Sequence, residues 1–171
     1  MEIKTRHLVL RPLAEGDLHT THAYASDPEN GMFIEFLPND TLEDTANFLR
    51  WAAGQWLSDT QTAYEFAITL DGAHIGAVSV NLDGDVASLG WIIHKAHWGK
   101  GYATEAAIAI RDFALDKLGA AKIVATCDYR NTTSVAIMKK IGMTLECASN
   151  VRNYKDGERD VQELRYALHR C

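Results

Sequence analysis

The sequence predicts an α+β (mixed α/β) fold, in which helices cover the faces of a mixed, mostly antiparallel sheet. Two observations carry this prediction. Strand-like segments flank the turn sequences Asp71-Gly72 and Asp156-Gly157, which are typical of antiparallel hairpins. Four other segments place apolar residues at helical spacing, and one of them joins two strands as a parallel crossover does. About seven strands and about four helices are therefore expected.

Seven segments are predicted to be strands. They are residues 8–12, 64–68, 75–82, 86–93, 122–127, 143–154 and 159–168. The antiparallel meander begins at residue 64, where apolar residues start to alternate with polar ones. Residues 122–127 are reached through a helix and are expected to pair in parallel with 86–93. Gly90 lies inside that strand, where a glycine indicates either a bulge or a close backbone approach.

Four segments are predicted to be helices. They are residues 15–26, 42–56, 102–118 and a segment that runs from Thr132 or Thr133 to the residue before Gly142. Glu15 and Asp17 favour the N-terminus of the first helix through its dipole. Thr41 and Asp44 have the spacing of a capping box at the start of the second helix. Gly119 is the stop signal of the third.

Length and charge limit the possible functions. With 171 residues, of which 47% are hydrophobic, the chain is long enough for one substantial core, so residues 1–171 are expected to form a single domain. The formal net charge is −6, from 23 acidic and 17 basic residues. A basic surface for nucleic acid or for an anionic membrane is therefore not expected. A cationic substrate suits this charge better.

Cysteine usage and the N-terminus point to a soluble, cytoplasmic protein. Cys127, Cys147 and Cys171 are odd in number and widely spaced, which favours neither a disulfide framework nor a metal site. The chain begins Met1-Glu2-Ile3-Lys4 without a charged segment followed by an apolar one. No apolar run reaches the length needed to cross a membrane.

The most informative segment is residues 97–105, which joins a strand to a helix with the sequence HWGKGYATE. Glycines just before a helix let successive backbone N–H groups converge on one point, where the helix dipole adds positive potential. Gly99 and Gly101 therefore predict an anion site, to which Lys100 can add a charge. A tight turn without a ligand is the alternative. The spacing fits neither a Walker A loop nor a dinucleotide fingerprint.

Residues 90–106 also resemble the acetyl-CoA motif of the GNAT acetyltransferases, written Gln/Arg-x-x-Gly-x-Gly/Ala. Trp98 takes the first position, Gly101 the glycine and Ala103 the last small residue. A Trp there resembles the subgroup of the RimJ and RimL ribosomal-protein N-terminal acetyltransferases. Residues 131–134 and 138–143, the opening strand 5–13 and Gly76 are similar to further family segments, so the resemblance covers nearly the whole chain.

The resemblance implies a GNAT-like fold and acetyl-CoA as co-substrate. Residues 86–93 would splay from 122–127, and the coenzyme would occupy the gap like an additional strand. Backbone amides of residues 98–104 would bind the pyrophosphate, and Lys139 or Lys140 could reach the phosphorylated ribose. The residues expected to bind the coenzyme are Ile92, Ile93, His94, Trp98, Gly99, Lys100, Gly101, Tyr102, Ala103, Thr104, Asn131 and Ser134.

The implied reaction is N-acetylation by direct attack of a primary amine on the thioester. The acceptor would be a small amine or a protein N-terminus, and a homodimer is possible. Ser88 stands where many relatives place a catalytic Glu, and Met138 where many place a Tyr that protonates the thiolate. Asp128 and Glu35 are the replacement candidates for the base. The alternatives are a non-catalytic acyl-CoA-binding or sensor module and a nucleotide-binding protein.

Overall fold

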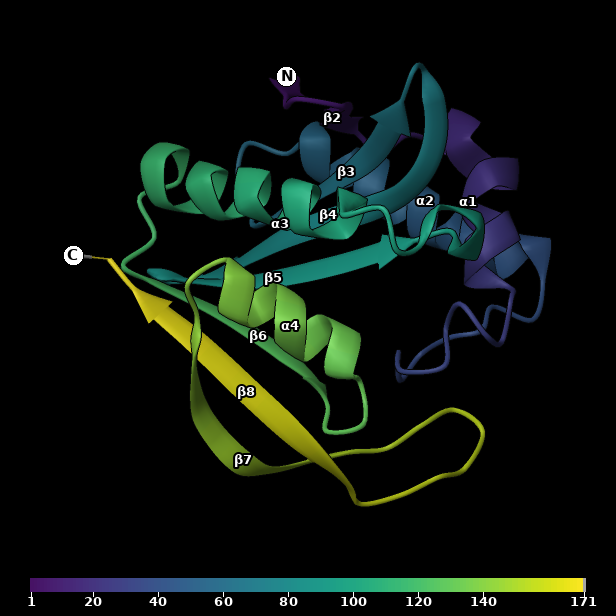
Figure 1. The fold of residues 1–171 in the computed structure, drawn as a ribbon. Helices are drawn as coiled ribbons and strands as arrows, with labels where there is room; N and C mark the ends of the chain where they lie inside the picture. Colours follow the sequence, from purple (N-terminus) through teal and green to yellow (C-terminus); the bar gives the residue numbers. More distant parts are fainter. Residues whose placement is uncertain (171) are drawn as a thin grey trace.

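The computed structural model describes residues 1–170, and eight of their strands form one sheet in the order β1-β2-β3-β4-β5-β6-β8-β7 (Figure 1). The strands are β1 (Ile3–Lys4), β2 (Leu8–Pro12), β3 (Ala63–Leu70), β4 (Ala73–Asp83), β5 (Val86–Ile93), β6 (Lys122–Asp128), β7 (Thr144–Arg152) and β8 (Val161–His169). Within residues 1–170, only β5 and β6 pair in parallel. The predicted class is confirmed, and the two-residue β1 accounts for the additional strand.

Two layers of helices cover the sheet. The helices are α1 (Leu18–Ala25), α2 (Leu42–Trp56), α3 (Tyr102–Asp112) and α4 (Thr132–Lys140). A 3-10 turn precedes α1, and one π-helical turn, Phe113–Lys117, continues α3. In Figure 1, α3 and α4 lie in front of the sheet and α1 and α2 lie behind it.

Alternation along β3 explains why both faces of the sheet are covered. Phe66 and Ile68 are fully buried in the core that includes α3 and α4. Ala67 points to the other face, where it packs with Leu49 and Ala52 of α2. A second small cluster on that face joins Tyr24 of α1 to the sheet. Because successive side chains of a strand point to opposite faces, β3 needs helices on both sides.

Local signals place the second helix where it was predicted. Thr41 Oγ1 accepts from the Asp44 N–H at 3.1 Å, and Asp44 Oδ2 accepts from the Thr41 N–H at 2.9 Å. This reciprocal pair satisfies two N–H groups at the start of α2. Within residues 1–170, no helix has both the length and the apolar composition needed to span a bilayer.

The two parallel strands separate early. β5 and β6 pair only at Val86–Lys122, Ala87–Ile123 and Ser88–Val124. Beyond Ser88, β5 continues beside β4 and β6 continues beside β8, so the predicted splay is confirmed. Figure 1 shows the two strands diverging below α3. The separation leaves one edge of β5 without a partner strand among the described residues.

One prediction about the strands needs correction, and the register separates the two alternatives at Gly90. The last two strands were expected at 143–154 and 159–168, but β7 ends at Arg152 and β8 begins at Val161. Tyr154 lies outside the ladder, because its N–H donates to Glu158 O at 2.8 Å within the β7–β8 connection. At Gly90 the β4–β5 register is regular, so there is no bulge. A Cβ at Gly90 would come 2.7 Å from Ser79 Oγ, so the close approach at this glycine is made by a side chain of β4 and not by backbone.

Gly76 on β4 provides a test of how tightly β5 is held. A Cβ at this position would overlap the carbonyl oxygen of Ile92 and lie 2.9 Å from Ile93 Cα, both backbone atoms of β5. We therefore expect Gly76→Ala to lower the free energy of unfolding by about 1–3 kcal/mol in urea titrations.

Gly54→Ala is the matched control for that substitution. Gly54 lies within α2, and a Cβ there would meet no atom within 4 Å. The same change should raise the free energy of unfolding by about 0.5–1 kcal/mol, because alanine favours the helix. Equal effects of the two substitutions would contradict the packing described for β4 and β5.

Candidate functional site

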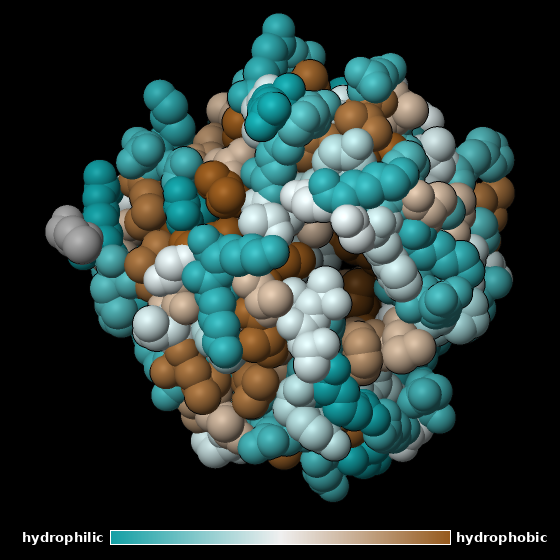
Figure 2. All heavy atoms as spheres, viewed as in Figure 1, coloured by the Kyte–Doolittle hydropathy of each residue, from teal (hydrophilic) through white to brown (hydrophobic). Residues whose placement is uncertain are grey.

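One cavity of about 1050 Å³ runs along the open edge of β5. Its first end is lined by the glycine loop and α4, and its second end by α1, α2 and the face of the sheet that they cover. Figure 2 shows a hollow on this side of the molecule with apolar residues at its bottom. The cavity therefore connects the predicted anion site to the opposite face of the sheet.

The glycine loop has the geometry of an anion site. Gly99 and Gly101 have φ values of +73° and +82°, and Gly101 is the N-cap of α3. Among residues 1–170, the six consecutive N–H groups from Gly99 to Thr104 have no hydrogen-bond acceptor. Together with the N-terminus of α3, they provide the donors and the potential that a phosphate requires.

Trp98 has a different role from the one predicted. Its backbone N–H donates to Lys95 O at 3.2 Å, so it is not free for a phosphate. Its indole N–H donates to the carbonyl of Ile93 at 2.8 Å and ties the glycine loop to the end of β5. Asn30, which is buried, donates to the same carbonyl at 2.8 Å and accepts from the Lys95 N–H.

The open edge of β5 presents the backbone of alternate residues. His94 N–H bonds to Ile75 O of β4, and Ile92 pairs with Ala77 of β4, so these two residues, both expected to bind the coenzyme, do not offer it free backbone N–H groups. Because alternate residues point to opposite edges, Trp91 and Ile93 face the gap. The Trp91 N–H and C=O and the Ile93 N–H are the groups available to a ligand.

Asn131 and Ser134 lie across the gap at the start of α4. Asn131 Oδ1 accepts from the Ser134 N–H at 3.1 Å and caps the helix. Ser134 Oγ accepts from the indole of Trp91 at 3.2 Å, which bridges β5 and α4. Both residues line the cavity, as do the predicted Ile92, Ile93, Trp98, Gly99, Gly101, Tyr102, Ala103 and Thr104. His94 and Lys100 are the two predicted coenzyme ligands outside its lining.

Comparison with known proteins gives this arrangement a family. The model of the acetyltransferase (GNAT) domain matches residues 7–144, which include the glycine loop and Asn131. The chain belongs to the GNAT acetyltransferase family. It is therefore an acyltransferase, and the predicted family is confirmed.

Relatives of this acetyltransferase agree over most of its length. The uncharacterized N-acetyltransferase YnaD of Bacillus subtilis (strain 168) is 29% identical over 150 residues, covering 85% of this chain and 84% of YnaD. A GNAT-family acetyltransferase from Bacillus anthracis has a TM-score of 0.82 at 28% identity, covering 99% and 98% of the two chains. RimL, a ribosomal L7/L12 alpha-N-protein acetyltransferase solved with coenzyme A, has a TM-score of 0.86 at 18% identity, covering 99% and 98%, and shows the same fold.

The three catalytic candidates of this acetyltransferase lie outside the cavity lining. Ser88 is exposed, and it is the last residue of β5 that pairs with β6. Glu35 accepts from the Asn153 N–H at 3.1 Å and forms an ion pair with Arg152, which joins the loop after α1 to the β7–β8 connection. Their proposed roles in catalysis stay predictions.

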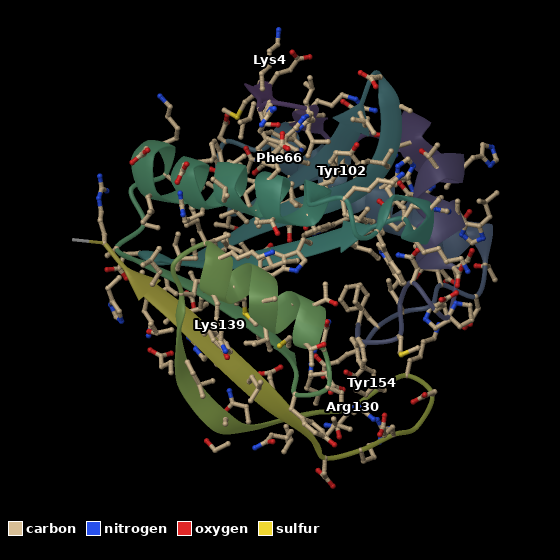
Figure 3. All side chains as sticks on the ribbon, in the orientation of Figure 1. Lys4, Phe66, Tyr102, Arg130, Lys139 and Tyr154 are labelled. Atoms are coloured by element: carbon tan, nitrogen blue, oxygen red, sulfur yellow. The ribbon has the colours of Figure 1, made fainter. Side chains whose placement is uncertain are left out.

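Asp128 is fully buried and engaged by its neighbours. Its carboxylate accepts from Arg130 at 2.6 Å and from the Tyr154 hydroxyl at 2.7 Å, and Figure 3 labels these two residues in the same region of the molecule. Burial by itself would raise the pKa of Asp128, but the hydrogen bonds from Arg130 and Tyr154 outweigh it and hold the pKa at about 2. A carboxylate of such low basicity is poorly suited to take a proton from an amine.

Glu65 on β3 is a cavity residue that the sequence analysis missed. Its side chain is 8% exposed, lines the second end of the cavity and has no hydrogen-bond partner among residues 1–170. Burial raises its pKa from 4.5 to about 7. The sequence signal that could have indicated Glu65 is a carboxylate within a strand. The neighbouring residues on the same face of that strand, Ala63 and Ala67, are apolar and buried.

Glu65 should make stability depend on pH. Because its folded-state pKa is about 7 and its ordinary pKa is 4.5, the unfolded chain ionises first as pH rises. The free energy of unfolding of the wild type should therefore fall, relative to Glu65→Gln, by about 3 kcal/mol between pH 4.5 and pH 8. Urea unfolding followed by circular dichroism at intervals across this range measures the difference. A constant difference would contradict a buried, ionisable Glu65.

Proposed function

We propose that this acetyltransferase moves the acetyl group of acetyl-CoA to a primary amine by direct attack, without a covalent enzyme intermediate. The observation that carries the proposal is the alignment of three binding elements along one cavity: the free N–H groups of the glycine loop, the open edge of β5 and the start of α4. A cavity that passes from a phosphate site to the other face of the sheet suits a long donor and a separate acceptor.

Each part of acetyl-CoA has a counterpart in the cavity. The six N–H groups from Gly99 to Thr104 suit the pyrophosphate. The pantetheine amides match the free backbone groups of Trp91 and Ile93, so that the coenzyme extends the sheet at the open edge. Lys140 on α4 lines the cavity and carries a charge suited to the ribose phosphate, and RimL was solved with coenzyme A in the same fold.

The Ile93 N–H is the donor that we assign to the developing oxyanion. It faces the gap at the end of β5, and its strand is held by β4 along its full length. In the reaction the amine nitrogen forms a C–N bond with the thioester carbon while the carbonyl electron pair moves to oxygen. Return of that pair breaks the C–S bond. One preorganised donor of this kind contributes about 3 kcal/mol to comparable acyl transfers.

A non-catalytic acyl-CoA sensor is the second candidate. Met138 is fully buried in the core, so no acidic side chain reaches the thiolate from this position. Ser88 offers no strong base and lies outside the cavity lining. A protein of this kind would bind the coenzyme without turnover.

Thiol release separates the two candidates. The purified protein, given acetyl-CoA and a panel of simple amines, polyamines and N-terminal peptides, should release coenzyme A thiol, measured with a chromogenic disulfide, in the presence of at least one acceptor class. Calorimetry should show binding of coenzyme A in preference to ATP. Binding without turnover for every acceptor would favour the sensor, and preference for ATP would contradict both.

Gly101 allows a test of the anion site in which only charge changes. Asn and Asp both tolerate the left-handed conformation that Gly101 adopts, and they have nearly the same shape. An Asp side chain at this N-cap would place its carboxylate among the free N–H groups and repel the pyrophosphate. We expect Gly101→Asp to bind coenzyme A about 10- to 100-fold more weakly than Gly101→Asn in calorimetry. Equal affinities would show that the loop does not hold the phosphates.

A further inference from the structure

The second end of the cavity, which we name the acceptor chamber, is bounded by Thr21, Tyr24, Phe48, Trp51, Glu65 and Ser79. We propose that this chamber binds a primary amine carried on an apolar substituent, and that Glu65 at its floor holds the ammonium group and takes its proton. The proposal rests on the proposed acetyl transfer, because the chamber opens onto the part of the cavity where the thioester would lie.

Strand register brings Glu65 into line with the open strand. Glu65 pairs with Ser79 of β4, and Ser79 pairs with Gly90 of β5. The three residues share one face of the sheet, and neighbouring strands are about 4.8 Å apart, so Glu65 lies roughly 10 Å from Gly90 along the backbone plane. The Ser79 hydroxyl fills the space above Gly90. A polar path therefore leads from the Glu65 carboxylate toward the edge that would hold the thioester.

Buried polar atoms without partners mark the chamber as a ligand site. Thr21 Oγ1 and Tyr24 Oη, one turn apart on α1, are buried; they lie close to each other, but neither has a hydrogen bond of ordinary geometry within residues 1–170. Glu65 likewise has none, and all three side chains line the cavity. Such groups are normally paired, because an unpaired buried donor or acceptor is costly. An alkyl ammonium has three N–H donors, which matches two hydroxyls and a carboxylate.

Charge in the chamber fits a single ammonium group. The other charged residues at this end are already paired: Glu29 with Lys95, and Arg152 with Glu35 and Glu163. Glu65 is the cavity carboxylate without an ion-pair partner among the described residues. One positive charge would complete the site, whereas the additional ammonium groups of a polyamine would find no free carboxylate in the lining.

Apolar and partly exposed side chains line the chamber and the part of the cavity beside it. Phe36 is 73% exposed, Met32 57% and Trp51 46%, and all three line the cavity together with Phe33 and Phe48. The Phe48 and Trp51 rings pack with centroids 5.8 Å apart. Large exposed apolar side chains gathered around a cavity indicate an apolar ligand surface. An amine with an aromatic or alkyl substituent would cover them.

The proton balance of the step is simple. The ammonium gives one proton to the Glu65 carboxylate, directly or through the Ser79 hydroxyl, and becomes a neutral amine. After the C–N bond has formed, the second proton passes from nitrogen to the departing sulfur, which gives the amide and the free thiol. Glu65 then returns its proton to solvent. The overall reaction releases one proton and needs no other reactant.

Several ionisable groups lie on the elements packed around Glu65. His22 of α1 is hydrogen-bonded to Thr45 of α2, Nδ1 to Oγ1 at 2.7 Å. Tyr24 on α1 faces it, and burial raises the pKa of that hydroxyl, so Tyr24 stays protonated. Arg11 on β2 is held by Asp17, and Arg50 on α2 by Glu43. β4 contributes Ser79 and Asn81 and also His74, whose ring packs edge-on against Tyr24 with centroids 5.8 Å apart and whose pKa burial lowers. Burial is the cause of the raised pKa of Glu65 itself.

The first experiment compares pH–rate profiles of the wild type and Glu65→Gln with acetyl-CoA and 2-phenylethylamine. The kcat/KM of the wild type should rise with pH through about 7 and fall near the pKa of the amine, about 10. In Glu65→Gln the rise of kcat/KM with pH near 7 should disappear. Its kcat at pH 7.5 should be about 100-fold lower than that of the wild type. Glu43→Gln, an exposed carboxylate on α2 outside the cavity, is the matched control and should keep the wild-type profile.

The second experiment tests the acceptor class. 2-Phenylethylamine and n-hexylamine should exceed spermidine and an Ala-Gly dipeptide in kcat/KM. Lengthening n-butylamine to n-hexylamine should lower KM about fourfold per methylene. Preference for spermidine or the dipeptide would overturn the apolar chamber. Trp51→Ala should reduce the preference for 2-phenylethylamine, and an unchanged preference would count against the chamber.

The two proposals can fail separately. If the wild type turns over amines and Glu65→Gln keeps the same pH profile, acetyl transfer stands and the role of Glu65 is overturned. If coenzyme A binds but no amine is acetylated, acetyl transfer is overturned. The chamber is then judged by calorimetry of 2-phenylethylamine with coenzyme A present: binding lost in Glu65→Gln supports it, and binding that is absent or unaffected refutes it. Unchanged coenzyme A affinity confirms that Glu65→Gln is folded.

Discussion

The separation of β5 from β6 beyond Ser88 is the constraint on which the rest of the site depends. Each strand is paired on its outer side, β5 with β4 and β6 with β8, and this pairing continues past the point where the two separate. An unpaired strand edge normally invites another strand. Here the unpaired edge lies inside a cavity between helices, where an extended ligand can use the same backbone groups.

Side chains from distant parts of the chain keep this edge in place. The carbonyl of Ile93 receives both Asn30 and the indole of Trp98, so the end of β5, the loop after α1 and the glycine loop meet at one oxygen. The indole of Trp91 reaches Ser134 across the gap. These contacts explain why a Trp stands at the first position of the motif: the side chain anchors the loop, and the glycines after it remain free to present their amides.

The face of the sheet covered by α1 and α2 buries polar groups that lack hydrogen-bond partners. A carboxylate on β3 is buried without a partner, next to two unpaired hydroxyls of α1. Such an arrangement lowers the stability of the empty protein, because each group loses its hydration without gaining a hydrogen bond. A cationic acceptor would restore those interactions, so the same groups that destabilise the fold favour the ligand. Asp128 shows the contrast, since Arg130 and Tyr154 satisfy it completely and leave it unsuited to proton transfer.

The sequence by itself determined the fold class and the glycine loop, because these depend on local signals: hairpin turns, helical spacing, a capping box and glycines near a helix start. It indicated the family through resemblance to a known motif. It also indicated the splay and Asn131 through resemblance to the family. Only the tertiary structure decided which backbone groups of β5 are free, since the pairing of Ile92 and His94 with β4 depends on register. Only the tertiary structure revealed Glu65, because its burial and raised pKa arise from α1, α2 and β4, which converge on it from separate parts of the chain.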